Sequence, residues 1–99
     1  MNKYLTEFIG TFFLVLTIGC TLIPGNAGVI PPLAIGAALM VMIFAGGHVS
    51  GGHYNPAVAI GADVMKLLNV SSLWIHWTAE FTGGALAGLA FKWINPSDA

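Results

Sequence analysis

Residues 48 to 58 read HVSGGHYNPAV, a polar and glycine-rich stretch in an otherwise apolar chain. Asn is a favoured N-cap residue and Pro is well tolerated at the first helical position, so Asn55 and Pro56 predict the start of a helix. That helix, residues 56 to 68, would be roughly 20 Å long, which is too short to cross a hydrocarbon core of about 30 Å. The stretch therefore predicts a re-entrant loop, residues 48 to 55, that leads into a half-helix.

The composition of the chain indicates an environment of lipid. Its 99 residues are 57% hydrophobic and 7% charged, and the mean hydropathy is +0.84. A soluble domain carries about 25% charged residues. The net charge of -1 offers no basic face, which argues against nucleic acid as a partner. The single cysteine, Cys20, excludes a disulfide within one chain and is expected to act as a small buried hydrophobe.

Three segments are long and apolar enough to be predicted as transmembrane helices, at residues 4 to 23, 28 to 47 and 73 to 94. A signal peptide is the alternative for the first, but this segment exceeds the apolar core of about 7 to 15 residues and contains Glu7. We predict an all-α membrane protein in which residues 1 to 99 form one unit, with three transmembrane helices and the re-entrant half-helix.

Non-helical backbone at membrane depth is tolerated only where it is buried in protein or lines water, so the loop predicts a pore. The N-terminus of the half-helix carries a partial positive charge, which disfavours cations and hydronium. The side-chain NH2 of Asn55 is expected to act as a donor in the pore. Successive backbone carbonyls are expected to act as acceptors, at Ser50, Gly51, Gly52 and His53. This arrangement suits water and small neutral solutes, whereas in a soluble chain Asn-Pro would indicate only a capped turn.

Two motifs carry a resemblance to a known family: Glu7 to Val15, EFIGTFFLV, and Gly47 to Val58, GHVSGGHYNPAV. The motifs and their separation resemble the first half of the major intrinsic proteins, the aquaporin and glycerol-channel family. The resemblance implies that Asn55, Pro56 and Ala57 form the central constriction of a channel.

The resemblance also implies roles for residues around that constriction. Glu7 is expected to brace the loop through hydrogen bonds, although a charge near the edge of its span is the alternative, and His48 is expected to fix the loop. Ile35 and Val58 take the filter positions. Val58 stands where the family's second motif has an arginine, and the chain has no arginine. Two apolar filter positions predict a wider and less selective passage, which admits solutes of the size of glycerol.

Family members hold two such halves in inverted orientation, whereas this chain holds one. Two half-helices must meet end to end to complete a pore, so a monomer is not expected to conduct. We predict that a second, oppositely oriented copy completes it, in an antiparallel homodimer or a higher homo-oligomer such as a tetramer of dimers. Lys3 and Lys66 on one predicted face oppose Lys92 on the other, a bias too weak to fix one orientation.

The third predicted span contains candidate packing and interface residues. Gly84 and Gly88 form a GxxxG pattern, and Gly83 and Ala87 are four apart beside it, which is typical of close helix contact in membranes. Glu80 lies in mid-span, where an ionised carboxylate costs at least about 2.5 kcal/mol, so it is expected to be protonated, paired or facing water. We assign Glu80 to packing or an interface, with His76 one turn earlier as a hydrogen-bond partner. A pore-facing role is the alternative.

Other chemistries have little support in the sequence. No metal site is expected from His48, His53 and His76, because no carboxylate or thiol lies at helical spacing around all three. No cofactor motif and no set of nucleophile, base and orienting acid is present, so we predict no cofactor and no enzyme. The favoured function is a passive channel for water and small neutral solutes in a multi-pass protein of the inner cell membrane. The alternative is a non-conducting truncated remnant, or a membrane helix interaction module.

Overall fold

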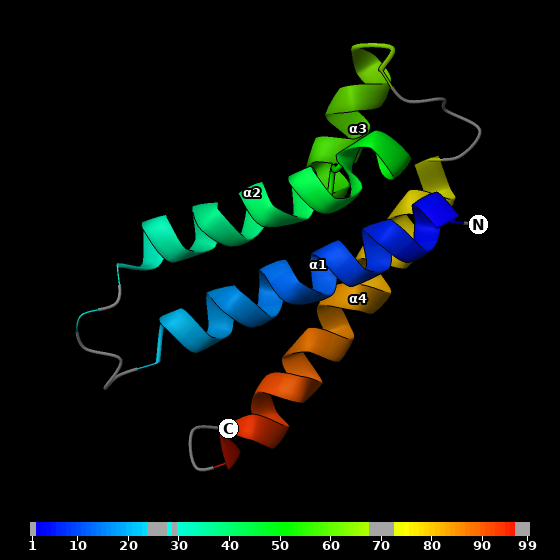
Figure 1. Cartoon of the computed structure of the whole chain (residues 1–99). Coiled ribbons are helices and arrows are strands. Elements are labelled where there is room, and N and C mark those ends of the chain that lie inside the picture. The colour runs from blue at the N-terminus through cyan, green and yellow to red at the C-terminus, as the bar shows by residue number, and fades with distance from the viewer. Residues whose placement is uncertain (1, 24–27, 29, 68–72, 97–99) are drawn as a thin grey trace.

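The computed structural model describes residues 2–23, 28, 30–67 and 73–96, and all regular structure in these ranges is helical. Figure 1 shows the four helices in chain order. They are α1 (Asn2–Thr21), α2 (Pro31–Ser50), α3 (Pro56–Val64) and α4 (Leu73–Ile94).

The bounds of α2 differ from the predicted segment of residues 28 to 47. The helix begins at Pro31, because a proline fits the first helical position and has no N–H to leave unpaired. It continues to Ser50 and ends at Gly51, whose φ of 93° is left-handed. Residues 48 to 50 therefore lie within the helix, and the non-helical part of the loop is shorter than predicted.

The half-helix α3 is shorter than predicted. It begins at Pro56 as expected, but it ends at Val64 after nine residues. Lys66 takes a left-handed φ of 64°, which does not continue a helix. The last residue of the predicted half-helix, residue 68, lies outside the described residues. At 1.5 Å per residue, α3 is about 14 Å long, close to half of a hydrocarbon core.

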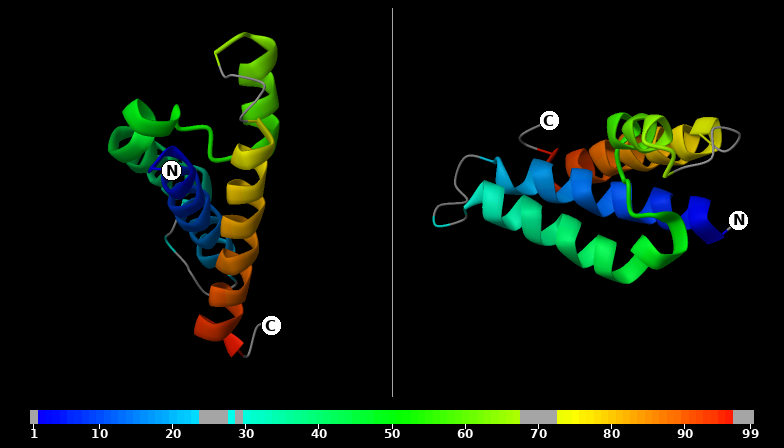
Figure 2. Two further views of the ribbon diagram at one scale, coloured as in Figure 1. Left: turned by 90° about the vertical axis from the view of Figure 1, so that its right-hand side faces the viewer. Right: turned by 90° about the horizontal axis from the view of Figure 1, so that it is seen from above.

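The helix α1 lies between α2 and α4, and it packs against both (Figure 2). It runs antiparallel to α2, from which the chain turns back to begin α3 (Figure 1). The short helix α3 packs against α4. The loop between α2 and α3 therefore lies where the ends of three long helices come together, and the start of α3 is held against α4.

The interior of the bundle is polar and its surface is apolar. Fully buried side chains include Glu7, His76 and Glu80, whereas Phe44 is 90% exposed. A soluble protein of this size would show the opposite distribution. Lipid solvates apolar side chains and leaves polar groups to pair inside the bundle, so this arrangement is that of an all-α membrane protein.

Two helices, α1 and α2, are long and apolar enough to cross a membrane by length and composition. The third predicted span is present as α4, with the predicted bounds of 73 to 94, but it is less apolar because it contains His76, Glu80 and Lys92. His76 and Glu80 are buried on the side of α4 that faces α1, and the exposed side of α4 carries large apolar side chains. That α4 also crosses the membrane remains our prediction.

Within the chain, the closest contact between α1 and α4 is made by Gly83 rather than by Gly84. A Cβ at Gly83 would lie 2.5 Å from the backbone oxygen of Phe8. Ala87, one turn later, is fully buried. Gly84 has only ordinary side-chain contacts, and a Cβ at Gly88 would meet nothing within 4 Å. The small-residue stripe is thus offset by one residue from the predicted GxxxG pair, whose role at an interface between chains stays a prediction.

Candidate functional site

The N-terminus of α3 is capped by Asn55. Its backbone is extended, and its side-chain oxygen accepts a hydrogen bond of 2.8 Å from the N–H of Ala57. The amide oxygen is used by the cap, so the NH2 group is the part of the side chain available to other molecules. Asn55 and Ala57 are both exposed. The start of the half-helix therefore presents a donor and a small side chain at its surface.

Two contacts hold α3 against α4. The indole N–H of Trp77 donates a hydrogen bond of 3.0 Å to the carbonyl oxygen of Pro56. Ala59 and Ala62, on the same side of α3, are buried, with 0% and 3% of their surfaces exposed. Small side chains let the two helices approach closely. The position of the capped end is thereby fixed by α4.

The loop before α3 reverses the chain through left-handed backbone. Gly51, Gly52 and Tyr54 have φ values of 93°, 67° and 55°. Glycine adopts such values without a steric penalty, but a bulky residue does so only where its surroundings hold it. Tyr54 is therefore a strained position, and its contacts must supply the stabilisation.

Glu7 supplies the central contacts of this loop. One carboxyl oxygen, Oε1, accepts a hydrogen bond of 2.7 Å from the N–H of Tyr54. The other, Oε2, accepts from the hydroxyl of Ser50 at 2.6 Å and from the N–H of His53 at 3.2 Å. Glu7 itself is fully buried. A carboxylate with three donors around it is a strong anchor, because hydrogen bonds to a charged group are about twice as strong as neutral ones.

The ring of Tyr54 fills a slot between α1 and α2. A Cβ at Gly10 would collide with the ring, and one at Gly46 would lie 2.6 Å from the hydroxyl oxygen. The hydroxyl donates a hydrogen bond of 2.7 Å to the carbonyl of Met42. Sequence reasoning missed this role for Tyr54. The available signal was a large aromatic residue in the loop together with small residues, Gly10 and Gly46, in two predicted spans that could make room for it.

The other predicted loop residues occupy varied positions. Ser50 is buried in the last turn of α2 and contributes its hydroxyl to Glu7, a side-chain role that was not predicted. Gly51 is exposed, Gly52 is buried and His53 is half-buried, so the predicted row of carbonyl acceptors stays a proposal. His48 is exposed on α2, and it makes no hydrogen bond to the loop within the described part of the chain. The groups that hold the loop are instead Glu7, Ser50 and Tyr54.

The predicted filter residues lie on different helices. Ile35 is half-buried on α2, and Val58 is 49% exposed in the first turn of α3. Val58 thus lies close to the exposed end of the half-helix, and its role at a filter stays a prediction. The role of Ile35 at a filter stays a prediction.

Next to the loop, α4 contributes two buried polar side chains, His76 and Glu80. The His76 ring lies 5.8 Å from the His53 ring and 5.4 Å from the Tyr4 ring, measured between centroids. Both oxygens of Glu80 are buried and accept no hydrogen bond from the residues the structure describes, so the predicted bond from His76 is not formed. In the same ranges, no group of three or more His, Cys, Asp or Glu side chains is placed to hold a metal ion.

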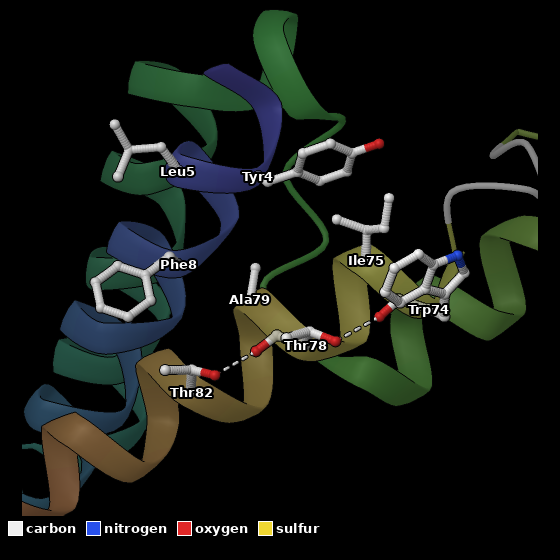
Figure 3. A pocket seen from close by; sticks show the side chains of 8 residues that line it. All are labelled: Tyr4, Leu5, Phe8, Trp74, Ile75, Thr78, Ala79 and Thr82. Carbon is white, nitrogen blue, oxygen red and sulfur yellow. Dashed lines mark hydrogen bonds between the residues drawn. The ribbon is translucent and has the colours of Figure 1, made fainter. Parts of the chain in front are cut away.

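A groove of about 320 Å³ lies between α1 and α4, and Figure 3 shows the residues around it. The hydroxyls of Thr78 and Thr82 both donate to carbonyls of their own helix, at 2.9 and 2.6 Å (Figure 3). The remaining lining is largely apolar: Tyr4, Leu5, Phe8, Trp74, Ile75 and Ala79. A surface of this kind suits lipid chains better than a path for water, so the groove is not the candidate pore.

The sequence of the chain matches a family model and several known proteins. Residues 1–91 match the family model described as Major intrinsic protein. The chain is 38% identical over 95 residues to Aquaporin TIP1-1 of Arabidopsis thaliana, an alignment that covers 93% of this chain and 38% of the relative. It is 41% identical over 88 residues to Aquaporin TIP2-3 of the same plant, covering 86% of this chain and 35% of the relative. The chain thus spans little more than a third of the length of these relatives.

Proposed function

Because the chain belongs to the major intrinsic protein family, we propose that it forms a passive channel for water and small neutral solutes such as glycerol. The half-helix α3 carries this proposal, because its capped N-terminus presents Asn55 and Ala57 at an exposed position inside a membrane bundle. Asn55, Pro56 and Ala57 line the constriction in this proposal. The donor NH2 of Asn55 orients passing solutes, and the positive end of α3 repels cations.

The second part of the proposal is that an oppositely oriented copy completes the pore. With a length of about 14 Å, α3 reaches only about halfway through the hydrocarbon core. A continuous path needs a second half-helix that meets the first end to end, as in other proteins built from inverted repeats. A twofold axis in the membrane plane would bring two copies of Pro56 together. The channel then is an antiparallel homodimer, or a higher oligomer of such pairs, in the cell membrane.

Osmotic shrinkage of vesicles tests whether the chain conducts. We expect the chain in lipid vesicles to raise water flow above that of empty vesicles, and Ala57→Trp to return it to the empty level by filling the constriction. Asn55→Asp keeps the cap acceptor but replaces the donor by a charge, and it is expected to lower the flow at least about tenfold. Ala85→Trp, which adds the same bulk on the exposed face of α4, serves as the matched control.

The outcomes of this experiment separate the proposal from its alternative. Unchanged flow in both Asn55→Asp and Ala57→Trp would remove the assignment of the constriction. An absence of flow in the unaltered chain would favour a non-conducting membrane piece.

The orientation of the chain tests the antiparallel pair. In a Cys20→Ser background, a single cysteine is introduced by Asn2→Cys or by Pro96→Cys, at exposed positions on opposite predicted faces of the membrane. We expect an impermeant thiol reagent to label about half of each variant in intact cells, because the lysine bias is too weak to fix one orientation. Labelling of one variant completely and the other not at all would mean one uniform orientation, which contradicts the proposal.

A further inference from the structure

We propose that Glu80 is a positioning residue, whose protonated carboxyl donates a hydrogen bond to the Glu7 carboxylate and so helps to hold the loop in front of Asn55. The proposal deepens the channel assignment and rests on it for the functional consequence. Its structural basis is a pair of buried carboxyl groups on neighbouring helices, Glu7 on α1 and Glu80 on α4.

Both members of the pair are removed from water. Glu7 is 0% exposed and Glu80 is 1% exposed. They lie on facing turns of α1 and α4, because Gly83, one turn after Glu80, packs against the backbone of Phe8, which follows Glu7. Two carboxyl groups that share a buried site cannot both be ionised without strong repulsion. No Lys or Arg lies in α4 before Lys92 to neutralise a second charge. One of the two groups must therefore carry a proton.

The hydrogen bonds around Glu7 assign the proton to its neighbour. The N–H groups of His53 and Tyr54 can only donate, so the Glu7 oxygens that they contact must accept. The hydroxyl of Ser50 donates to Glu7 as well. A carboxylate has about four acceptor positions. Oε2 uses two of them and Oε1 uses one, which leaves one position on Oε1 for a further donor.

Glu80 is the group that can fill this position. Neither of its oxygens receives a hydrogen bond within the described ranges, and the backbone N–H of Asn55 lies close to it without completing one. An ionised Glu80 would therefore be a buried charge to which no hydrogen bond is completed. The titratable groups that face this site are Glu7 and Tyr4 from α1, His53 and Tyr54 from the loop, and His76 from α4. A protonated Glu80 satisfies its own O–H and the last acceptor position of Glu7 together.

This bond would connect three parts of the bundle at one carboxylate. Glu7 belongs to α1, its first three donors belong to the end of α2 and the loop, and Glu80 adds α4. The half-helix is already held on α4 by the hydrogen bond from Trp77 to Pro56. With Glu80 bonded to Glu7, α4 would hold both the loop and the start of α3. Glu80 therefore contributes to the position of Asn55 without contacting a solute.

Two substitutions distinguish this role from the others. Glu80→Gln keeps a donor and a similar shape, and it is expected to retain the thermal stability and the vesicle water flow of the unaltered chain. Glu80→Met removes the donor but keeps the size. It is expected to lower the unfolding temperature by at least about 4 °C, since about 1 kcal/mol shifts a domain of this size by that amount, and to reduce water flow.

Infrared spectroscopy provides a readout that does not depend on conduction. The chain has four Asp and Glu residues, so the carbonyl band of a buried protonated carboxyl at neutral pH can be assigned by substitution. We expect this band in the unaltered chain and in Asp63→Asn, and we expect it to be lost in Glu80→Gln.

Each of the remaining outcomes would overturn the proposal. The band could be absent from the unaltered chain or persist in Glu80→Gln, Glu80→Gln could be as damaging as Glu80→Met, or Glu80→Met could be harmless. If the chain does not conduct at all, the channel assignment fails, but the band and the unfolding temperatures still decide the protonation and contact of Glu80. If Glu80→Met does not fold, the band in Glu80→Gln still decides it.

Discussion

Replacing Glu7 with Ala is expected to abolish water flow and to cause the largest loss of stability of any single substitution in the loop region. Three donors, from Ser50, His53 and Tyr54, would lose their acceptor at a buried position. Each buried donor without a partner costs about 1–3 kcal/mol, so the total reaches several kcal/mol even after water enters the space. The free energy of unfolding in detergent and the osmotic response of vesicles both measure the effect.

The matched control for this substitution is Asp63→Asn. Asp63 is a half-buried carboxylate on α3, away from the loop, and its neutralisation is expected to change neither quantity appreciably. Glu7→Gln is an informative intermediate, because it keeps one acceptor oxygen but turns an NH2 group toward donors. Wild-type stability in Glu7→Ala would show that the loop is held by other contacts and would remove Glu7 from the site.

Replacing Gly83 with Leu is expected to push α1 and α4 apart. The added Cβ would lie 2.5 Å from the backbone oxygen of Phe8 and 3.4 Å from the backbone nitrogen of Phe12, and a helix backbone cannot move aside as a side chain can. Overpacking of this kind costs about 1–3 kcal/mol and more where backbone is hit. Because Glu7 and Glu80 lie on these two helices, separation would also break the contact between them and reduce water flow.

Gly36→Leu tests whether the effect is specific to this contact. It adds the same side chain at an exposed position of α2, where a new Cβ would meet nothing within 4 Å. We expect the two variants to differ by at least about 2 kcal/mol in the free energy of unfolding. Equal stability of the two would show that α1 and α4 are not in close backbone contact at Gly83.

The helices were predictable where local rules decide them. Pro56 after Asn55 predicts the start of α3 correctly, because capping and the missing N–H of proline act within one turn. The end of α3 was missed, because Val64 to Leu68 is apolar except for Lys66 and continues a helical pattern. Its end at Val64 depends on a left-handed Lys66, a type of residue that gives no warning of such a backbone.

The site was predictable only in part, because it depends on how the helices pack. Residues 48 to 50 were predicted to belong to the loop, yet they lie in α2, and Gly46 leaves room for the hydroxyl of Tyr54. The predicted partner of Glu80 was His76, one turn earlier on the same helix. Spacing along one helix can be read from a sequence, whereas contacts between helices cannot. The position of Glu80 beside Glu7 arises from the docking of α4 on α1.

The hydrogen bond from Trp77 to Pro56 gives the protein an optical reporter of the start of its half-helix. Indole emission depends on whether the ring N–H is bonded and on how polar its surroundings are. Trp77 is half-buried against α3, whereas Trp74 and Trp93 are exposed on the outer face of α4. In a Trp74→Phe, Trp93→Phe background, the fluorescence of Trp77 would follow the half-helix as it docks or detaches, without any attached dye.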